Sequence, residues 1–229
     1  MHHDSDSKPK SHSGKNGKAH DDDAPLGSLH DTPLRPDAFQ LDDDLKKELI
    51  ADHMRSIMLV LGLDLDDDSL KGTPERVARM YVDEIFSGLD PRRKPKISLF
   101  ANKYKYGQML VVRDITVTSF CEHHFVPFMG KAHVAYISSG KVIGLSKLNR
   151  IVQYFAKRPQ VQERLTVQIA DAMKEALDTQ DVAVLVDATH LCVQARGVQD
   201  MQSSTVTSEY CGRFMDTAVR NEFLNYIAR

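Results

Sequence analysis

Two short segments of the sequence are rich in side chains that bind divalent metals. Residues 121–124 read Cys-Glu-His-His, and residues 189–192 read Thr-His-Leu-Cys. A turn with C-x-x-H spacing can present a thiolate and an imidazole to one ion, and this pair of groups is typical of zinc sites. The second segment is expected to end a strand, where residues two apart point the same way. The spacing therefore predicts Cys121, His124 and Cys192 as metal ligands, with His190 beside the metal.

Other interpretations of these residues stay open at this stage. Cys192 could be a buried core thiol, the commonest environment of a free cysteine, or the site could be a closed structural zinc site. Cys211 is the only spare cysteine and lacks any paired spacing. Three ligands without a fourth favour an open site that holds a water, whose pKa zinc lowers to ~7. His123 and His190 would then be imidazoles that serve general acid–base chemistry.

A second group of residues indicates an anion site. Residues 144–150 read Gly-Leu-Ser-Lys-Leu-Asn-Arg and open a predicted helix with Ser146 as its cap. Lys147 and Arg150 share a face near that N-terminus, and Arg196 adds a cation close to the second metal segment. Backbone N–H groups, a hydroxyl and cations at a helix start can bind phosphate. A solvated polar helix face is the alternative.

Two further charged residues lie in predicted first turns. Glu163 is either an acid that compensates the helix dipole or a carboxylate that accepts N–H bonds from a planar heterocycle such as guanine. Arg76 is interpreted from spacing as an ordinary exposed arginine. Metal, imidazoles, phosphate site and carboxylate together indicate a nucleotide hydrolase.

The elements that must position these groups follow from hydrophobic periodicity. Two N-terminal helices are expected, at 42–61 and 73–86. The remaining order is strand, strand, helix, helix, strand, strand and final helix, at 109–120, 131–137, 146–158, 160–177, 181–193, 203–214 and 217–227. This order predicts an α+β fold, an antiparallel sheet with two helices on one face. Such a sheet has exposed edges that oligomerisation would cover.

Composition limits the class of protein. The chain has 229 residues, 41% hydrophobic residues and a formal net charge of −2, which argues against a nucleic-acid binder. It has no apolar run of ~18 residues and only three cysteines, so we expect a cytoplasmic protein without a membrane segment. Residues 1–37 are predicted to be a disordered polar tail, 38–100 a helical region and 101–229 the catalytic domain.

Four segments of the sequence resemble GTP cyclohydrolase I. They are the Ser-Phe-Cys-Glu-His-His-Phe-Val-Pro-Phe run at 119–128, Gly-Leu-Ser-Lys-Leu at 144–148, Gln-Val-Gln-Glu-Arg-Leu-Thr at 160–166, and 188–198. The resemblance implies a tunnelling fold (T-fold), in which sheets of five subunits form a barrel and two rings stack into a toroidal decamer. It implies active sites at subunit interfaces. It also implies conversion of GTP and water to 7,8-dihydroneopterin triphosphate and formate, in folate or biopterin synthesis.

The resemblance also implies roles for single residues. Cys121, His124 and Cys192 match zinc ligands, and His123 and His190 match catalytic histidines, with His190 donating a proton after an activated water attacks C8 of guanine. Glu163 matches the carboxylate that recognises guanine. The triphosphate and ribose contacts match Ser146, Lys147, Arg150 and Arg196. Arg76 matches a phosphate-binding arginine supplied by the neighbouring subunit, which replaces its interpretation as an exposed side chain.

Two other functions compete with this one. A T-fold relative with nitrile-reductase-like chemistry would use a cysteine nucleophile and a nicotinamide, and would not need the three metal ligands. A non-catalytic, zinc-stabilised assembly module would not need His123, His190, Lys147 or Glu163. The sequence identifies no regulatory protein partner and does not choose between folate and biopterin synthesis.

Overall fold

The computed structural model describes residues 31–228. Most of the predicted polar tail, residues 1–30, lies outside the described residues, and residues 31–37 contain no helix or strand. Among the described residues, no helix combines the length and the apolar character needed to cross a bilayer.

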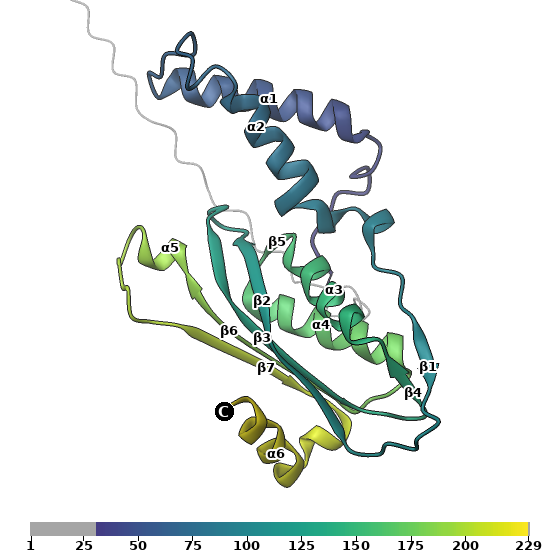
Figure 1. Ribbon diagram of the computed structural model, residues 1–229. Helices are drawn as coiled ribbons and strands as arrows, with labels where there is room; N and C mark the ends of the chain where they lie inside the picture. Colours follow the sequence, from purple (N-terminus) through teal and green to yellow (C-terminus); the bar gives the residue numbers. More distant parts are fainter. Residues whose placement is uncertain (1–30, 229) are drawn as a thin grey trace, which may run out of the picture.

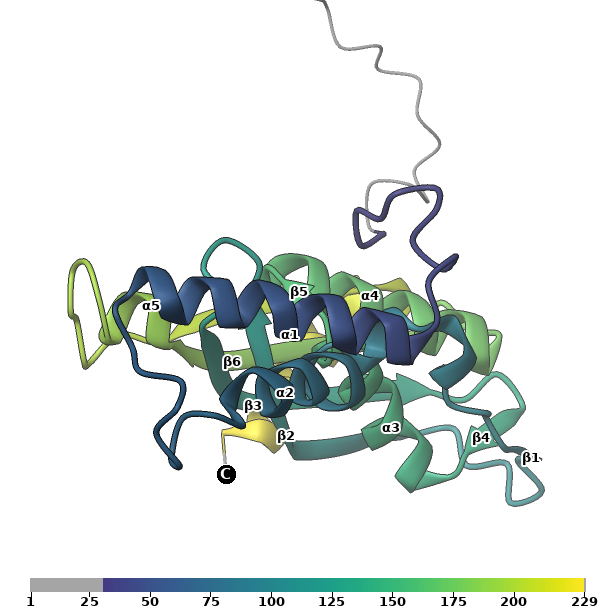
Figure 2. The same cartoon turned by 90° about the horizontal axis from the view of Figure 1, so that it is seen from above.

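Two helices precede the sheet and project from one end of it (Figure 1). Helix α1 (Asp43–Val60) begins where the Asp42 side chain accepts a hydrogen bond from the Leu45 N–H, as an aspartate cap should. Helix α2 (Thr73–Arg79) begins at the predicted start, residue 73, with Gly72 in the cap position. It continues as a π-helical segment over Met80–Ile85. Figure 2 shows α1 lying across this end of the molecule.

The predicted apolar face of α1 is largely exposed in the single chain. Only Ala51 and Met58 are buried on this helix, whereas Leu49 and Ile57 are 41% and 53% exposed. The periodicity therefore identified the helix correctly, but the chain by itself offers most of that face no partner.

A five-stranded sheet forms the centre of the molecule, with the strand order β5-β2-β3-β6-β7. The long strands pair antiparallel, as predicted, and only the two-residue β5 runs parallel to β2. The strands are β2 (Met109–Cys121), β3 (Pro127–Ile137), β5 (Pro159–Gln160), β6 (Val182–His190) and β7 (Thr205–Tyr210). A separate two-stranded sheet joins β1 (Leu99–Ala101) to β4 (Lys141–Ile143), and these short strands were not predicted.

Helices cover both faces of the sheet (Figure 1). Helices α3 (Leu145–Ala156) and α4 (Gln162–Leu177) pack on one face, as predicted, over alternating residues such as Val117, Val134 and Val184. Helix α6 (Thr217–Ile227) lies on the other face, where Phe223 contributes to a smaller core. The alternation of strand side chains explains how one sheet supplies two cores.

A bulge in β2 brings a backbone N–H into hydrogen-bond contact with a buried histidine on β3. The register with β3 shifts between Val112 and Ile115, and Asp114 takes a positive φ of 59°. The Asp114 N–H, freed from the ladder by this bulge, donates to His133 Nδ1 at 3.3 Å. Burial lowers the pKa of His133, partly offset by the carboxylate of Asp114.

Candidate metal centre

The structure brings the three predicted metal ligands together. Their ligand atoms, on Cys121, His124 and Cys192, all lie within 4.8 Å of one another. Cys121 ends β2 and is buried, His124 is exposed in the turn that follows, and Cys192 is half-buried. The Cys121 Sγ–His124 Nδ1 distance is 3.9 Å. The chain thus folds two distant segments into one candidate site.

The donor set and its spacing fit a zinc-type ion. A tetrahedral site with Zn–S of about 2.3 Å and Zn–N of about 2.0 Å separates its ligand atoms by about 3.5 Å, slightly less than the separation seen here. Within residues 31–228 no fourth Cys, His or carboxylate joins the group. His123 places its Nδ1 3.7 Å from Cys121 Sγ but lies outside the group. Two thiols and one imidazole therefore leave room for a further ligand.

Backbone hydrogen bonds shape the turn that carries two of these ligands. The Phe125 N–H donates to the Cys121 carbonyl at 2.8 Å, and the Cys121 N–H donates to the Val126 carbonyl at 2.9 Å. Phe125 adopts a positive φ of 53°, a conformation that costs free energy in a non-glycine residue. Its ring packs at 5.1 Å, between ring centroids, on Phe86 from the N-terminal region. Backbone hydrogen bonds inside the turn and the packing of Phe125 on Phe86 therefore both stabilise its conformation.

Cys192 reaches the site by a route that the sequence prediction got wrong. Strand β6 ends at His190, whose last partner is Phe128 on β3, and residues Leu191–Gln194 form a single helical turn, α5. Because Cys192 lies in this helical turn, it does not share a strand face with His190. Burial, and then the neighbouring Cys121 thiol, raise the pKa of Cys192, so metal binding must displace a proton from it.

His190 is the last residue of β6, two residues before Cys192, and its ring makes two close contacts. Its ring stacks on Phe128 with centroids 4.7 Å apart and planes 12° apart, and its Nε2 lies 2.8 Å from Gln162 Oε1. Burial lowers the pKa of His190, and the carboxylate of Glu163 partly offsets that effect. A histidine that is neutral near pH 7 and close to a metal can exchange protons with a bound substrate.

A charged network that the sequence analysis missed connects the metal turn to α4. Arg164 donates through Nη2 to the Glu122 carboxylate and through Nε to Gln160 Oε1 at 3.0 Å. The Glu122 N–H also donates to the Gln160 carbonyl at 3.0 Å. The side chains of Arg164 and Glu122 are only 14% and 27% exposed. Two residues of α4 therefore bond to this region, Gln162 to His190 and Arg164 to the metal turn.

Arg196 contacts the metal group directly. Its Nη1 donates to His124 Nε2 at 2.9 Å. A guanidinium only donates, so this bond uses the Nε2 lone pair. A metal at Nε2 would need the same lone pair, and a metal at Nδ1 would require the ring proton on Nε2. Metal binding by His124 and this Arg196 contact therefore exclude each other.

The other predicted anion-binding residues are not bonded to the metal group in the part of the chain that the structure describes. Arg76 donates to the Ser69 carbonyl and to Thr73 Oγ1. Gly144, and not Ser146, is the cap of α3, and Ser146 sits exposed in its first turn. Among residues 31–228, no hydrogen bond or ion pair joins the metal ligands to the four residues in question, Arg76, Ser146, Lys147 and Arg150.

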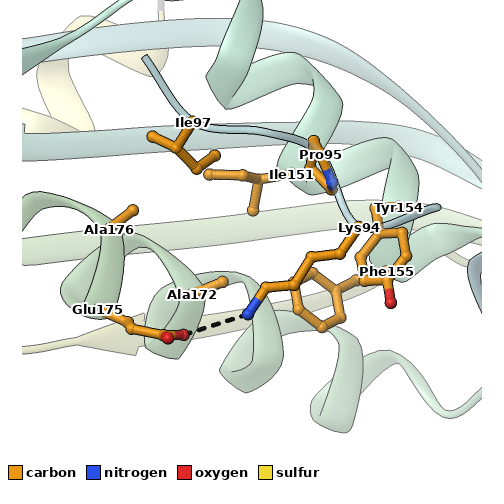
Figure 3. Close-up of a pocket in the computed structure, with 9 residues that line it drawn as sticks. All are labelled: Lys94, Pro95, Ile97, Ile151, Tyr154, Phe155, Ala172, Glu175 and Ala176. Carbon is orange, nitrogen blue, oxygen red and sulfur yellow. Dashed lines mark hydrogen bonds and ion pairs between the residues drawn. The ribbon is translucent and has the colours of Figure 1, made fainter. Parts of the chain in front are cut away.

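Two cavities lie along α3, and one of these residues, Arg150, lines the larger of the two. Arg150 lines a cavity of about 300 Å³ together with Arg93 and Lys157. A smaller cavity, of about 140 Å³, lies between residues 94–97 and helices α3 and α4, and the Lys94–Glu175 ion pair at 3.4 Å spans it (Figure 3). None of the predicted site residues lines the smaller cavity, so it is separate from the metal centre.

The sheet, its helix pair and this donor set define a T-fold protein with a Cys/His group that could hold a metal ion. Comparison with known proteins agrees: the family model described as GTP cyclohydrolase I matches residues 50–228. The chain belongs to the GTP cyclohydrolase I family. It is 58% identical over 205 residues to GTP cyclohydrolase 1 of Flavobacterium johnsoniae, covering 90% of this chain and 92% of that protein. It is 57% identical over 198 residues to GTP cyclohydrolase 1 of Escherichia coli (strain K12 / DH10B), covering 86% and 89%.

Proposed function

We propose that this chain opens the imidazole ring of GTP by hydrolysis, releases formate and closes the product to 7,8-dihydroneopterin triphosphate. The observation that carries the proposal is the Cys121–His124–Cys192 group with the half-buried His190 beside it. Family membership supports the same chemistry. A nitrile reductase would not need the three metal ligands, and a non-catalytic assembly module would not need the acid–base histidines.

The proposed metal is zinc, held by two thiolates and one imidazole. Zinc supplies an activated water at neutral pH, because the cation lowers the pKa of a coordinated water to ~7. His190 and His123 then move protons to and from the purine ring during C8 attack and formate release. Glu163 accepts the N1–H and exocyclic N–H bonds of guanine. Its electrostatic effect on His190 supports a position beside the reacting ring.

We assign the triphosphate and ribose contacts to four residues of one chain, namely Ser146, Lys147, Arg150 and Arg196. Arg76 of a neighbouring subunit supplies a further phosphate contact. Arg196 already lies at the metal group, whereas the single chain keeps Arg76 apart from it. A site shared between subunits accounts for that separation. The exposed apolar face of α1 and the unpaired edge of β7 support a homo-oligomer, which we propose to be a decamer.

We assign the chain to the cytoplasm and its product to folate or biopterin synthesis. Cys121, Cys192 and Cys211 are all free thiols, which suits a reducing compartment and is required of thiolate ligands. Both pathway products contain a pterin ring, so the proposed reaction would supply either one.

The test is formate release from GTP by the purified full chain, before and after zinc is stripped and restored. We expect formate from the zinc-loaded protein, loss after stripping and recovery on zinc addition. His190→Ala should retain zinc and the oligomer but lose at least 100-fold in kcat, in the range of general acid–base catalysis. A folded, zinc-loaded protein that makes no formate would instead favour the assembly module.

A second arm tests guanine recognition by Glu163. Inosine triphosphate lacks the exocyclic amino group, so the normal protein should prefer GTP by a large factor in kcat/KM. Glu163→Gln should lose most of that preference, because an amide cannot accept both N–H bonds as a carboxylate does. An unchanged preference would remove Glu163 from the guanine site.

A further inference from the structure

Gln162 has an amide whose orientation is fixed by its surroundings. The residue is 1% exposed, in the first turn of α4. Its Nε2 donates to the Val186 carbonyl at 3.0 Å, to the Thr205 carbonyl at 2.8 Å and to Thr207 Oγ1 at 3.2 Å. Backbone carbonyls only accept hydrogen bonds, so a flipped amide would place its oxygen against two other oxygens. The NH₂ group must therefore face β6 and β7.

This orientation dictates where the proton of His190 lies. With the NH₂ group committed to the two strands, Oε1 faces His190 Nε2 at 2.8 Å. An amide oxygen only accepts, so Nε2 must carry hydrogen. A neutral imidazole has one N–H, which leaves the lone pair of the ring on Nδ1.

Two contacts together fix the His190 ring. Stacking on Phe128, itself fully buried, sets the plane of the ring. The bond to Gln162 sets its rotation within that plane. Phe128 and Gln162, which are not metal ligands, therefore determine the direction in which Nδ1 points.

A hydroxyl chain braces Gln162 in turn. Thr166 Oγ1 donates to the Gln162 carbonyl at 2.9 Å and lies 2.6 Å from Thr207 Oγ1, so Thr207 must supply the hydrogen between the two hydroxyls. Among the described residues, no buried side-chain nitrogen or oxygen lacks a partner. A buried network in which every polar group has a partner favours a single arrangement of its side chains.

We propose that Gln162 is the positioning residue that holds His190 as its Nε2-protonated tautomer, and so makes Nδ1 the ring atom that exchanges protons with the substrate. The role of the substrate in this inference rests on the proposed function. The tautomer itself does not, because it follows from contacts within the chain.

Removing the amide oxygen should affect turnover more than binding. Gln162→Met keeps the length and volume of the side chain but gives His190 no acceptor, so both tautomers become populated and Nδ1 is no longer reliably free. We expect kcat to fall about 100-fold, with KM for GTP and the zinc content changed less than threefold.

Two more variants separate this role from a purely structural one. Gln162→Glu still presents an oxygen to His190 but sets a second oxygen against the Val186 and Thr205 carbonyls. It should therefore keep the tautomer and at least ten times the kcat of the Met variant, while it lowers the melting temperature. Thr207→Val is the matched control, since the two carbonyls still orient the amide; its tautomer and kcat should stay near normal.

The experiment uses zinc-loaded full-length protein with ¹⁵N-labelled histidine, and His190→Ala to assign the ring signals. Without substrate, NMR should show Nε2 protonated and Nδ1 unprotonated in the normal protein and in the Glu variant, and a mixture in the Met variant. A proton on Nδ1 in the normal protein, or an unchanged tautomer and kcat in a folded Met variant, would overturn the proposal. The expected tautomers in a protein that releases no formate would refute the proposed function alone.

Discussion

Replacement of Arg164 by lysine should weaken zinc binding without changing any charge. Arg164 reaches Glu122 and Gln160 at the same time through two different nitrogens. A lysine ammonium is a single point donor and cannot hold both partners in that fixed geometry. Arg164→Lys therefore isolates the positioning of the metal turn from the electrostatics of the site.

The structure sets the size of the expected effect. Loss of a residue that orients a metal ligand typically costs 10–100-fold in metal affinity. Here the turn keeps its backbone hydrogen bonds at Cys121, Glu122 and Phe125, of 2.8–3.0 Å. We therefore expect the lower end of the range, about tenfold or ~1.4 kcal/mol.

The assay is competition for zinc between the protein and a chromophoric chelator at fixed pH. Arg55→Lys is the matched control, because Arg55 also holds two partners at once, Asp52 and Glu75, but on the exposed surface of α1 and α2. Arg164→Gln provides the charge arm: electrostatics alone predicts tighter binding of a cation, whereas loss of positioning predicts weaker binding. Equal zinc affinity in a stably folded Arg164→Lys protein would refute the reasoning.

Three further results are expected. Cys192→Ala should abolish stoichiometric zinc in metal analysis, and full zinc occupancy would contradict the ligand set. Because the pKa of His133 is lowered from 6.5 in the folded chain, its contribution to stability is fully present above about pH 6.5 and is lost as the pH falls. His133→Gln should reduce the fall of the unfolding free energy between about pH 7.5 and 5, measured by urea unfolding, whereas the exposed His53→Gln should not. Parallel stability curves for the unmodified protein and His133→Gln would contradict this prediction. Gly130→Ala should destabilise the fold by about 3 kcal/mol, since a Cβ there would stand 2.0 Å from a backbone oxygen of β6. Gly107→Ala meets nothing closer than 4.0 Å and should be near neutral; thermal unfolding of both variants is the measurement.

Local patterns predicted the elements whose determinants lie within a few residues. Helix α6 spans Thr217–Ile227, as its apolar spacing indicated, and the start of α1 follows from the Asp42 cap. The ligand set was also predictable, because a C-x-x-H turn and a second His/Cys pair supply the donor types that zinc prefers. The structure places Cys121, His124 and Cys192 together as expected.

Tertiary placement decided the features that the sequence did not reveal. Gln162 and Arg164 look like ordinary polar residues of a helix start, and their partners on β6, β7 and the metal turn become visible only in the folded chain. The helical turn at Cys192 was missed because an apolar run does not show where a strand loses its partner. The assignment of Arg76 to a neighbouring subunit stays a prediction, since periodicity carries no information about other chains.

The contact between Arg196 and His124 makes the metal and an anion thermodynamically linked. Because His124 cannot accept from Arg196 and bind a metal at once, metal binding releases the guanidinium. Any phosphate that draws Arg196 away from His124 must in turn raise metal affinity by the same factor that the metal raises phosphate affinity. We therefore expect positive cooperativity between metal and phosphate at this group, because each would break the same Arg196–His124 contact.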